Sequence, residues 1–112
     1  MKRIEAIVRP ERVPHVLAAL EHIDHPGLMI TEIEGHGKQK GVEQAARGKT
    51  YKVELLTKSK IEMVVNDSDA DGMLKVIREA ALTGRVGDGK IFIYPVENAM
   101  RIRTGEEGES AL

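Results

Sequence analysis

Residues 61–77, IEMVVNDSDADGMLKVI, decide the fold, because a strand pattern passes directly into a helix pattern within them. Ile61, Met63 and Val65 are apolar at every second position, which is typical of one face of a β-strand. The following apolar residues have the spacing of one helix face: Ala70, Met73, Leu74 and Ile77. Between them, Ser68 and Asp71 are spaced as a capping box, which predicts that the helix begins near Ser68.

The same pattern occurs 57 residues earlier in the chain. The alternating strand residues are Ile4, Ala6 and Val8, and the helix-face residues are Val13, Val16, Leu17 and Leu20. Each half then ends in a further predicted strand, at residues 28–33 and 91–96. Two βαβ units in tandem predict an α+β fold of the ferredoxin-like class, with an antiparallel sheet and two helices on one face.

The predicted strands carry apolar residues on both faces. Those on the second face alternate with the residues that define the first: Ile7, Val64, Phe92 and Tyr94. Two helices can cover only one face of such a sheet, so the other needs a second subunit to bury it. We therefore predict a homo-oligomer.

Two segments interrupt the internal repeat. The second unit is about five residues longer than the first before its last strand, and we assign this excess to residues 84–90, GRVGDGK. A long segment, about residues 36–56, separates the two units, where a hairpin needs only two to five residues. Loops of that length are usually functional or disordered.

Composition narrows the classes of function. The 112 residues carry a net charge of -1 and few aromatic side chains, which argues against a nucleic-acid-binding protein. No cysteine is present to form a disulfide or a thiolate metal site. The first residues do not resemble a signal peptide, and no apolar run is long enough to cross a membrane. We expect a soluble cytoplasmic protein with a single domain.

The glycine-rich segment has the spacing of a phosphate-binding loop, with Gly84 followed by Gly89 and Lys90. However, Ile91 stands where such a loop needs Ser or Thr, and the predicted order is helix to strand rather than strand to helix. These differences exclude a P-loop hydrolase. The glycine N–H groups can still form an anion-binding nest, and the alternative is a flexible connection.

Two arginines near the C-terminus provide further positive charge. Arg101 and Arg103 are two residues apart, so on an extended segment both guanidinium groups point to the same side. Together with Lys90 they could neutralise most of the charge of a triphosphate. The alternative is a solvated basic pair that faces the acidic tail, residues 104–112.

The remaining residue patterns do not predict an enzyme. The segment between the units is basic, and Tyr51 is its only aromatic residue. The four histidines lack the spacing of a metal site, and no Ser/His/Asp set or carboxylate pair predicts a catalytic centre.

Several motifs together resemble those of the PII nitrogen-regulatory signal proteins. They are GHGKQKG (35–41), RGKTYKVELLTKSKIE (47–62), KIEMVV (60–65), TGRVGDGKIFIYPV (83–96) and RIRTGEEG (101–108). The resemblance covers essentially the whole chain, so residues 1–112 are expected to form one PII-like domain.

The resemblance implies a homotrimer that binds ATP or ADP in clefts between subunits, with 2-oxoglutarate bound beside ATP and Mg²⁺. The implied nucleotide-binding residues are Ile7, Gly37, Lys38, Gln39, Glu62, Val64, Gly87, Asp88, Gly89, Lys90, Arg101 and Arg103. Within this set, Glu62 would hold the ribose, and Ile7 and Val64 would lie near the base. The implied 2-oxoglutarate residues are Gln39, Lys40, Gly41 and Lys58, and Gln39 would also contact the metal.

The resemblance also implies partners for the long segment, expected at about residues 36–56. These are an ammonium channel, whose pore the residue at Arg47 would enter, and enzymes or a sensor kinase of nitrogen metabolism. Membrane contact would occur only through the channel. Tyr51 matches the position that a uridylyltransferase modifies in many bacteria. Lys38, Pro26 and Met29 depart from the usual residues of the family, and each of them can alter nucleotide affinity.

We therefore predict a trimeric sensor of nucleotide and 2-oxoglutarate that is not an enzyme. One alternative is a slow ATP-hydrolysing or phosphotransfer enzyme on the same fold, which a turnover assay would detect. A second alternative is a ligand-free trimeric scaffold, which would give no heat in a nucleotide titration.

Overall fold

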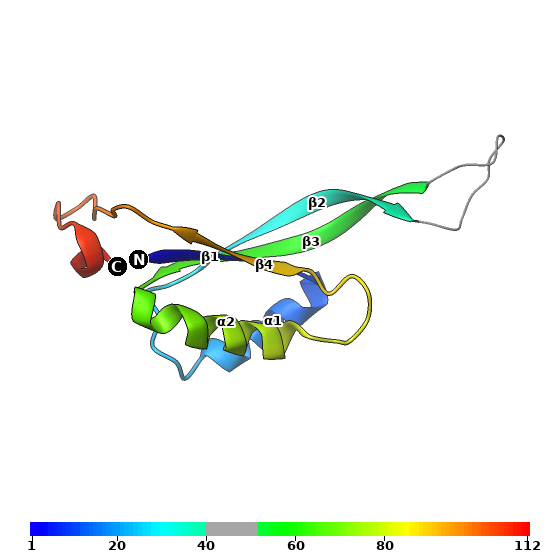
Figure 1. The fold of residues 1–112 in the computed structure, drawn as a ribbon, viewed down its shortest axis with the longest axis horizontal. Helices are drawn as coiled ribbons and strands as arrows, with labels where there is room; N and C mark the ends of the chain where they lie inside the picture. Colours follow the sequence, from blue (N-terminus) through cyan, green and yellow to red (C-terminus); the bar gives the residue numbers. More distant parts are fainter. Residues whose placement is uncertain (40–51) are drawn as a thin grey trace.

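The computed structural model describes residues 1–39 and 52–112. The elements follow the order β1 (Lys2–Val8), η1 (Pro10–Arg12), α1 (Val13–Leu20), β2 (Met29–Gln39), β3 (Lys52–Val65), α2 (Asp67–Ala81), β4 (Lys90–Pro95) and η2 (Gly108–Ala111). Both helices lie on one face of the sheet, as Figure 1 shows. No helix in the described part of the chain combines the length and the apolar character needed to cross a bilayer.

The four strands form one antiparallel sheet in the order β2-β3-β1-β4. β3 lies between β1 and β2 and runs antiparallel to both, so β1 and β2 are the parallel strands of a split βαβ unit. β4 closes the second unit by pairing with the outer side of β1. The predicted double βαβ fold of the ferredoxin-like class is confirmed.

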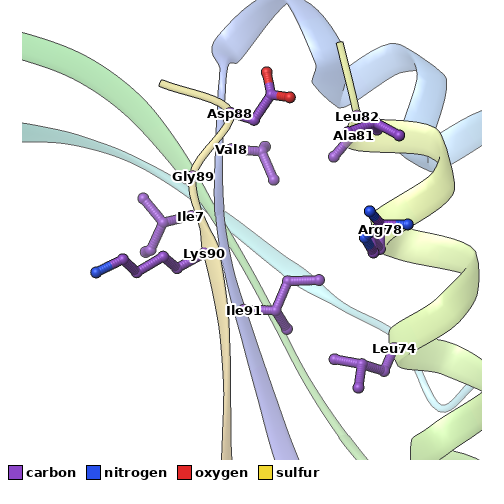
Figure 2. Close-up of a pocket in the computed structure, with 10 residues that line it drawn as sticks. All are labelled: Ile7, Val8, Leu74, Arg78, Ala81, Leu82, Asp88, Gly89, Lys90 and Ile91. Carbon is purple, nitrogen blue, oxygen red and sulfur yellow. The ribbon is translucent and has the colours of Figure 1, made fainter. Parts of the chain in front are cut away.

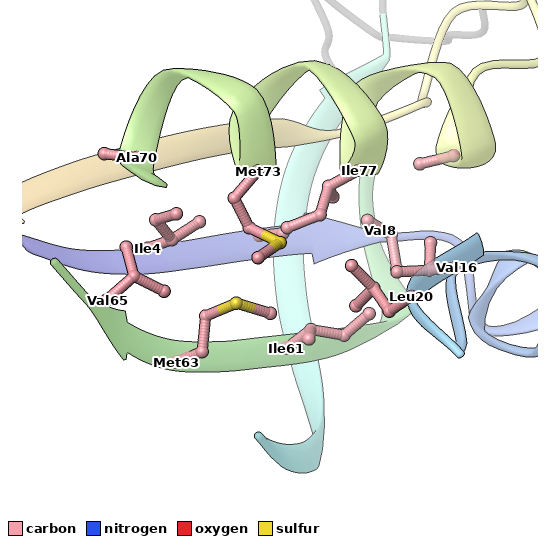
Figure 3. Close-up of a cluster of buried hydrophobic side chains, with 12 residues drawn as sticks. Ile4, Val8, Val16, Leu20, Ile61, Met63, Val65, Ala70, Met73 and Ile77 are labelled. Atoms are coloured by element: carbon pink, nitrogen blue, oxygen red, sulfur yellow. The ribbon is translucent and has the colours of Figure 1, made fainter. Parts of the chain in front are cut away.

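The core lies between the sheet and the two helices (Figure 3). Alternating strand residues of β1 and β3 pack against residues on one face of each helix. The buried apolar residues are Ile4, Ala6, Val8, Val16, Leu20, Ile61, Met63, Val65, Ala70, Met73, Ile77 and Ala81. Of the predicted helix-face residues, Val13 and Leu74 are only partly buried, and Leu17 is 39% exposed. Burial of each large side chain contributes about 1.5–3 kcal/mol, so this layer supplies most of the fold's stability.

Neither α1 nor α2 covers the opposite face of the sheet, called the open face, which carries charged groups as well as apolar ones. Glu5 and Glu62 are directly paired between β1 and β3. Arg3 contacts both carboxylates, with its Nη2 3.7 Å from Glu5 and its Nη1 3.4 Å from Glu62. Its guanidinium group also lies 4.1 Å from the ring centre of Tyr94, whose hydroxyl donates to Glu5 at 3.2 Å. Arg3 therefore offsets the repulsion between two neighbouring acids.

The β2–β3 hairpin is longer than the sequence pattern predicts. The ladder continues to the pair Gln39 and Lys52, so residues 36–39 and 52–56, which we expected in the long loop, belong to strands. The expectation was wrong because glycine and lysine are poor strand formers, whereas pairing along a neighbouring strand overrides that preference. Lys40, Gly41, Arg47 and Tyr51 lie outside the described residues.

Two further boundaries differ from expectation. α2 begins at Asp67, and its N-cap is Asn66 rather than Ser68, so the predicted capping box does not form. α2 also continues to Ala81, about one turn past Ile77, which corresponds to Leu20 at the end of α1. The connections at residues 21–28 and 82–89 are equally long. The extra residues of the second unit therefore extend the helix, and the prediction that they form the glycine-rich loop was wrong.

Candidate functional site

The candidate site is the glycine loop, defined as residues 83–89, which joins the end of α2 to the start of β4. Gly84, Gly87 and Gly89 all have positive φ, at 89°, 104° and 102°. A Cβ on Gly89 would lie 1.7 Å from the carbonyl oxygen of Ile7, so only glycine lets the loop cross the end of β1 this closely. The glycines are therefore required by the backbone path.

The Asp88 side chain closes the loop by bonding to residues at its other end, Thr83 and Gly84. One carboxylate oxygen accepts from the N–H groups of Thr83 and Gly84, each at 2.9 Å. The other accepts from Arg9 Nε at 3.0 Å and from the Thr83 hydroxyl. These bonds favour the charged form, and the bond from the Thr83 hydroxyl contributes most, so the pKa of Asp88 is held well below its ordinary value. Because its carboxylate is engaged within the loop, Asp88 can offer a ligand only its main chain.

Two cations from other parts of the chain hold consecutive carbonyl groups of the loop. Arg9, just after β1, donates from Nη2 to the Val86 carbonyl at 2.8 Å. Lys58, on β3, donates from Nζ to the Gly87 carbonyl. Gly87 itself is exposed. The loop is thus attached to β3 and to the residue that follows β1, as well as to its own ends.

Lys90 begins β4 and is paired with Ile7 of β1, so both side chains lie on the face of the sheet opposite α1 and α2. A cleft of about 380 Å³ lies on the other side, between α2 and the first residues of β4. Its lining is mostly apolar, from Ile7, Val8, Leu74, Ala81, Leu82 and Ile91, and it also includes Arg78, Asp88, Gly89 and Lys90. Figure 2 shows the Lys90 side chain pointing away from α2. An anion held by Lys90 would therefore lie on the open face, not in this apolar cleft.

The C-terminal segment is folded, so the predicted extended arrangement of its arginines was wrong. Residues 102–104 form a turn, which is closed by Gly105 N–H donating to Arg101 O at 2.8 Å and Arg101 N–H donating to Glu106 O at 2.9 Å. The Arg101 Nη1 atom also lies 3.6 Å from Glu106 Oε1. Arg101 therefore faces the acidic tail, as in the alternative interpretation, and Arg103 is exposed on the turn.

The structure brings only some of the predicted residues together. Lys58 and Lys90 flank the glycine loop, whereas Arg101 and Arg103 lie beyond the far end of β4 (Figure 1). β4 has six residues, and an extended strand of that length spans about 20 Å. Glu62 and Val64 lie on the open face of β3, and Glu62 is paired with Arg3. Gly37, Lys38 and Gln39 are in β2.

Arg9 and Thr83 are site residues that the sequence interpretation missed. Thr83 stands five residues before Asp88, a spacing at which a hydroxyl and a carboxylate can close a loop, so a local signal existed. Arg9 follows β1 and meets the loop only after the sheet has formed, so no local pattern could identify it. Across residues 1–39 and 52–112, no three His, Cys, Asp or Glu side chains are grouped to hold a metal ion.

Comparisons with known proteins agree with this architecture. Residues 1–106 match the family model for Nitrogen regulatory protein P-II. The chain is 48% identical over 112 residues to Nitrogen regulatory protein P-II 2 of Methanothermobacter thermautotrophicus, covering 100% of this chain and 97% of that protein. It is 47% identical to Nitrogen regulatory protein P-II of Rhodospirillum rubrum, covering 100% of both. The crystal structure of Arabidopsis thaliana PII bound to citrate matches with a TM-score of 0.80 and 37% identity, covering 99% of this chain and 91% of that one.

Proposed function

Because the chain belongs to the nitrogen regulatory protein P-II family, we propose that it is a signal protein that binds ATP or ADP at the seams of a homotrimer. The observation that carries the proposal is the glycine loop, whose exposed backbone lies beside Lys90. Main-chain N–H groups and a lysine are the donors that phosphate oxygens accept.

The arrangement of cations supports a site between chains. Lys90 lies at one end of β4, and Arg101 and Arg103 follow its other end (Figure 1). One chain cannot bring both groups to the same phosphates, because the intervening strand is paired with β1 and cannot fold back. A ring of chains that places the C-terminal turn of one subunit next to the glycine loop of another would unite them.

The open face supports the same assembly. Ile7, Val64 and Phe92 lie on this face, and Phe92 is 44% exposed. Apolar groups on a sheet face without helices are usually covered by a partner. Within the described residues, Ile7 and Val64 are the candidates for contacting a nucleotide base on this face. Glu62 lies on the same face and would bind the ribose.

We include 2-oxoglutarate and Mg²⁺ in the proposal as further ligands of the site between subunits. Lys58 supplies a cation next to the phosphate-binding loop, which suits the distal carboxylate of a dicarboxylic keto acid. When bound with ATP, the metal would offset the repulsion between phosphate and carboxylate, so keto-acid binding depends on ATP. Gln39, the last residue of β2, would complete this part of the site together with Lys40 and Gly41, which lie outside the described residues.

We assign the signalling output to the segment between β2 and β3. Arg47 and Tyr51 fall within it as the expected channel-contact and uridylylation positions. The partners proposed for it are an ammonium channel in the membrane and cytoplasmic enzymes or a sensor kinase of nitrogen metabolism. Co-purification from nitrogen-starved cells, with and without an ammonium pulse, tests this part directly. A pulse that leaves the set of bound proteins unchanged would contradict it.

Titration calorimetry tests the ligand-binding proposal. Wild-type protein should release or absorb heat with ATP alone, and with 2-oxoglutarate only when ATP and Mg²⁺ are present. Lys90→Ala and Arg103→Ala should each weaken ATP binding at least about tenfold, because each removes a charge-assisted contact. Lys75→Ala is the matched control, since Lys75 is an exposed lysine on α2 and its loss changes the net charge equally.

The outcomes separate the proposal from its alternatives. Both site variants should remain trimeric by sedimentation, so that weaker binding reflects the site and not assembly. Equal ATP affinity in Lys90→Ala and wild type would remove the glycine loop from the nucleotide site. No heat in any titration would leave a ligand-free scaffold, and sustained release of phosphate from ATP would favour the enzyme alternative.

A further inference from the structure

The glycine loop can bind an anion only if its N–H groups face outward. Two side chains that bond to loop carbonyl groups determine the direction of these N–H groups. In a trans peptide the C=O of one residue and the N–H of the next point in opposite directions. No cis peptide occurs in the described residues. The direction of each loop carbonyl therefore fixes the direction of the N–H that follows it.

Lys58 and Arg9 hold two consecutive peptide planes of the loop in this way. The bond from Arg9 to the Val86 carbonyl turns the Gly87 N–H away from Arg9. The bond from Lys58 to the Gly87 carbonyl turns the Asp88 N–H away from Lys58. Meanwhile the Asp88 carboxylate takes up the N–H groups of Thr83 and Gly84, so these are not available to a ligand.

Glycine at position 87 makes this control necessary. Its φ of 104° is open to glycine alone, and glycine has no side chain to restrict rotation of the adjoining peptides. Arg9 limits the space on one side, because a Cβ on Gly87 would lie 3.1 Å from Arg9 Nη2. Without an external partner for its carbonyl, the plane between residues 87 and 88 is held only through its neighbours in the chain, Asp88 and Gly89.

We propose that Lys58 is a positioning residue for phosphate binding, which orients the peptide between Gly87 and Asp88 so that its N–H faces the nucleotide. This role rests on the proposed nucleotide site and differs from a contact of Lys58 with a keto acid. Because an ammonium group has three N–H donors, Lys58 can hold the Gly87 carbonyl and a carboxylate at the same time, which is compatible with keto-acid binding that depends on ATP.

The test measures ATP binding by calorimetry without Mg²⁺ and without any keto acid, so that only the nucleotide is probed. Lys58→Met should weaken ATP binding about five- to tenfold, and Lys58→Arg, which keeps a cationic donor, should stay within about twofold of wild type. Lys75→Met is the control for net charge. Circular dichroism and sedimentation establish that each variant is folded and assembled as the wild type.

A second measurement distinguishes positioning from attraction by charge alone. In 0.5 M KCl, charge attraction across solvent is largely screened, because the Debye length falls to a few ångströms. The relative loss in Lys58→Met should persist there. The amide NMR signals of Gly87 and Asp88 in the nucleotide-free protein should also shift in Lys58→Met, and they should stay in place in Lys75→Met.

The results identify which idea fails. If wild type binds no ATP, the proposed function fails. If wild type binds ATP and Lys58→Met binds it equally well, only the positioning role fails. A loss that disappears in 0.5 M KCl, with the two amide signals unmoved, would also overturn the positioning role.

Discussion

The two helix-to-strand connections of this protein are equally long but are held in different ways. In the first, residues 21–28, the only side-chain hydrogen bond that the described residues show is local, from Gly27 N–H to His25 Nδ1 at 3.2 Å. In the second, residues 82–89, Asp88 joins the loop's own ends, and the loop is also attached to Arg9, which follows β1, and to Lys58 of β3.

The difference shows how two repeated units can have connections of equal length and yet hold them differently. The extra residues of the second unit extend α2, and the glycine loop gains its definite shape from bonds to distant residues. Long-range attachment fixes backbone groups that a surface loop normally leaves mobile. We therefore expect substitutions in the second connection to cost more stability than their counterparts in the first.

The largest contrast is expected between Gly89→Ala and Gly27→Ala. Both glycines have positive φ, at 102° and 114°, so each substitution strains the backbone by about 1–3 kcal/mol. A Cβ on Gly89 would also overlap the Ile7 carbonyl at 1.7 Å, whereas nothing lies within 4 Å of a Cβ on Gly27. Urea unfolding at one fixed protein concentration should show a loss of at least about 3 kcal/mol for Gly89→Ala. Equal losses in the two variants would contradict the close crossing of β1.

Asp88→Asn should reduce stability in a manner that depends on pH. The pKa of Asp88 is lowered in the folded protein from an ordinary value of 3.8, so the charged carboxylate stabilises the fold above that value. This contribution is lost as pH falls from 3.8 toward the lower folded pKa. The difference in unfolding free energy between wild type and Asp88→Asn should be constant from pH 7 to 5 and should narrow below pH 4.

The control for this titration is Asp24→Asn, which changes an acid in the first connection. Because Asp24 is exposed, Asp24→Asn should cost less stability at pH 7 than Asp88→Asn. If the difference between wild type and Asp88→Asn did not narrow below pH 4, the carboxylate would not be closing the loop.

His25→Ala should have the smallest effect of the series. Its bond to Gly27 N–H is exposed and joins residues only two apart, so solvent can replace it. We expect less than about 0.5 kcal/mol by urea unfolding. A loss comparable to that of Asp88→Asn would show that the first connection is held as firmly as the second.

The fold class could be predicted from the sequence because the same pattern of core residues occurs in both halves of the chain. Ile4 and Ile61 occupy equivalent places in central strands, and both are buried, so alternation and helical spacing identified β1, β3 and both helices correctly. The glycine loop could also be identified from the sequence, because its backbone path requires three closely spaced glycines and such a cluster is unusual beside a strand. The family resemblance is confirmed by the match over residues 1–106.

Other features depend on contacts that no local pattern encodes. Residues 36–39 extend β2 because β3 is there to pair with them, and their composition alone favours a loop. Arg101 pairs with Glu106 because residues 102–104 turn, so the spacing of two arginines did not give their directions. The attachment of Lys58 to Gly87 joins β3 to the second connection, and it could be found only in three dimensions.

The distance between Lys90 and the C-terminal arginines has a genetic consequence. In the proposed trimer each seam takes Lys90 from one chain and Arg103 from its neighbour. A cell that produces two defective copies, one with Lys90→Ala and the other with Arg103→Ala, would assemble mixed rings in which some seams contain both native residues. Two alleles that are each inactive alone would then restore part of the response when expressed together.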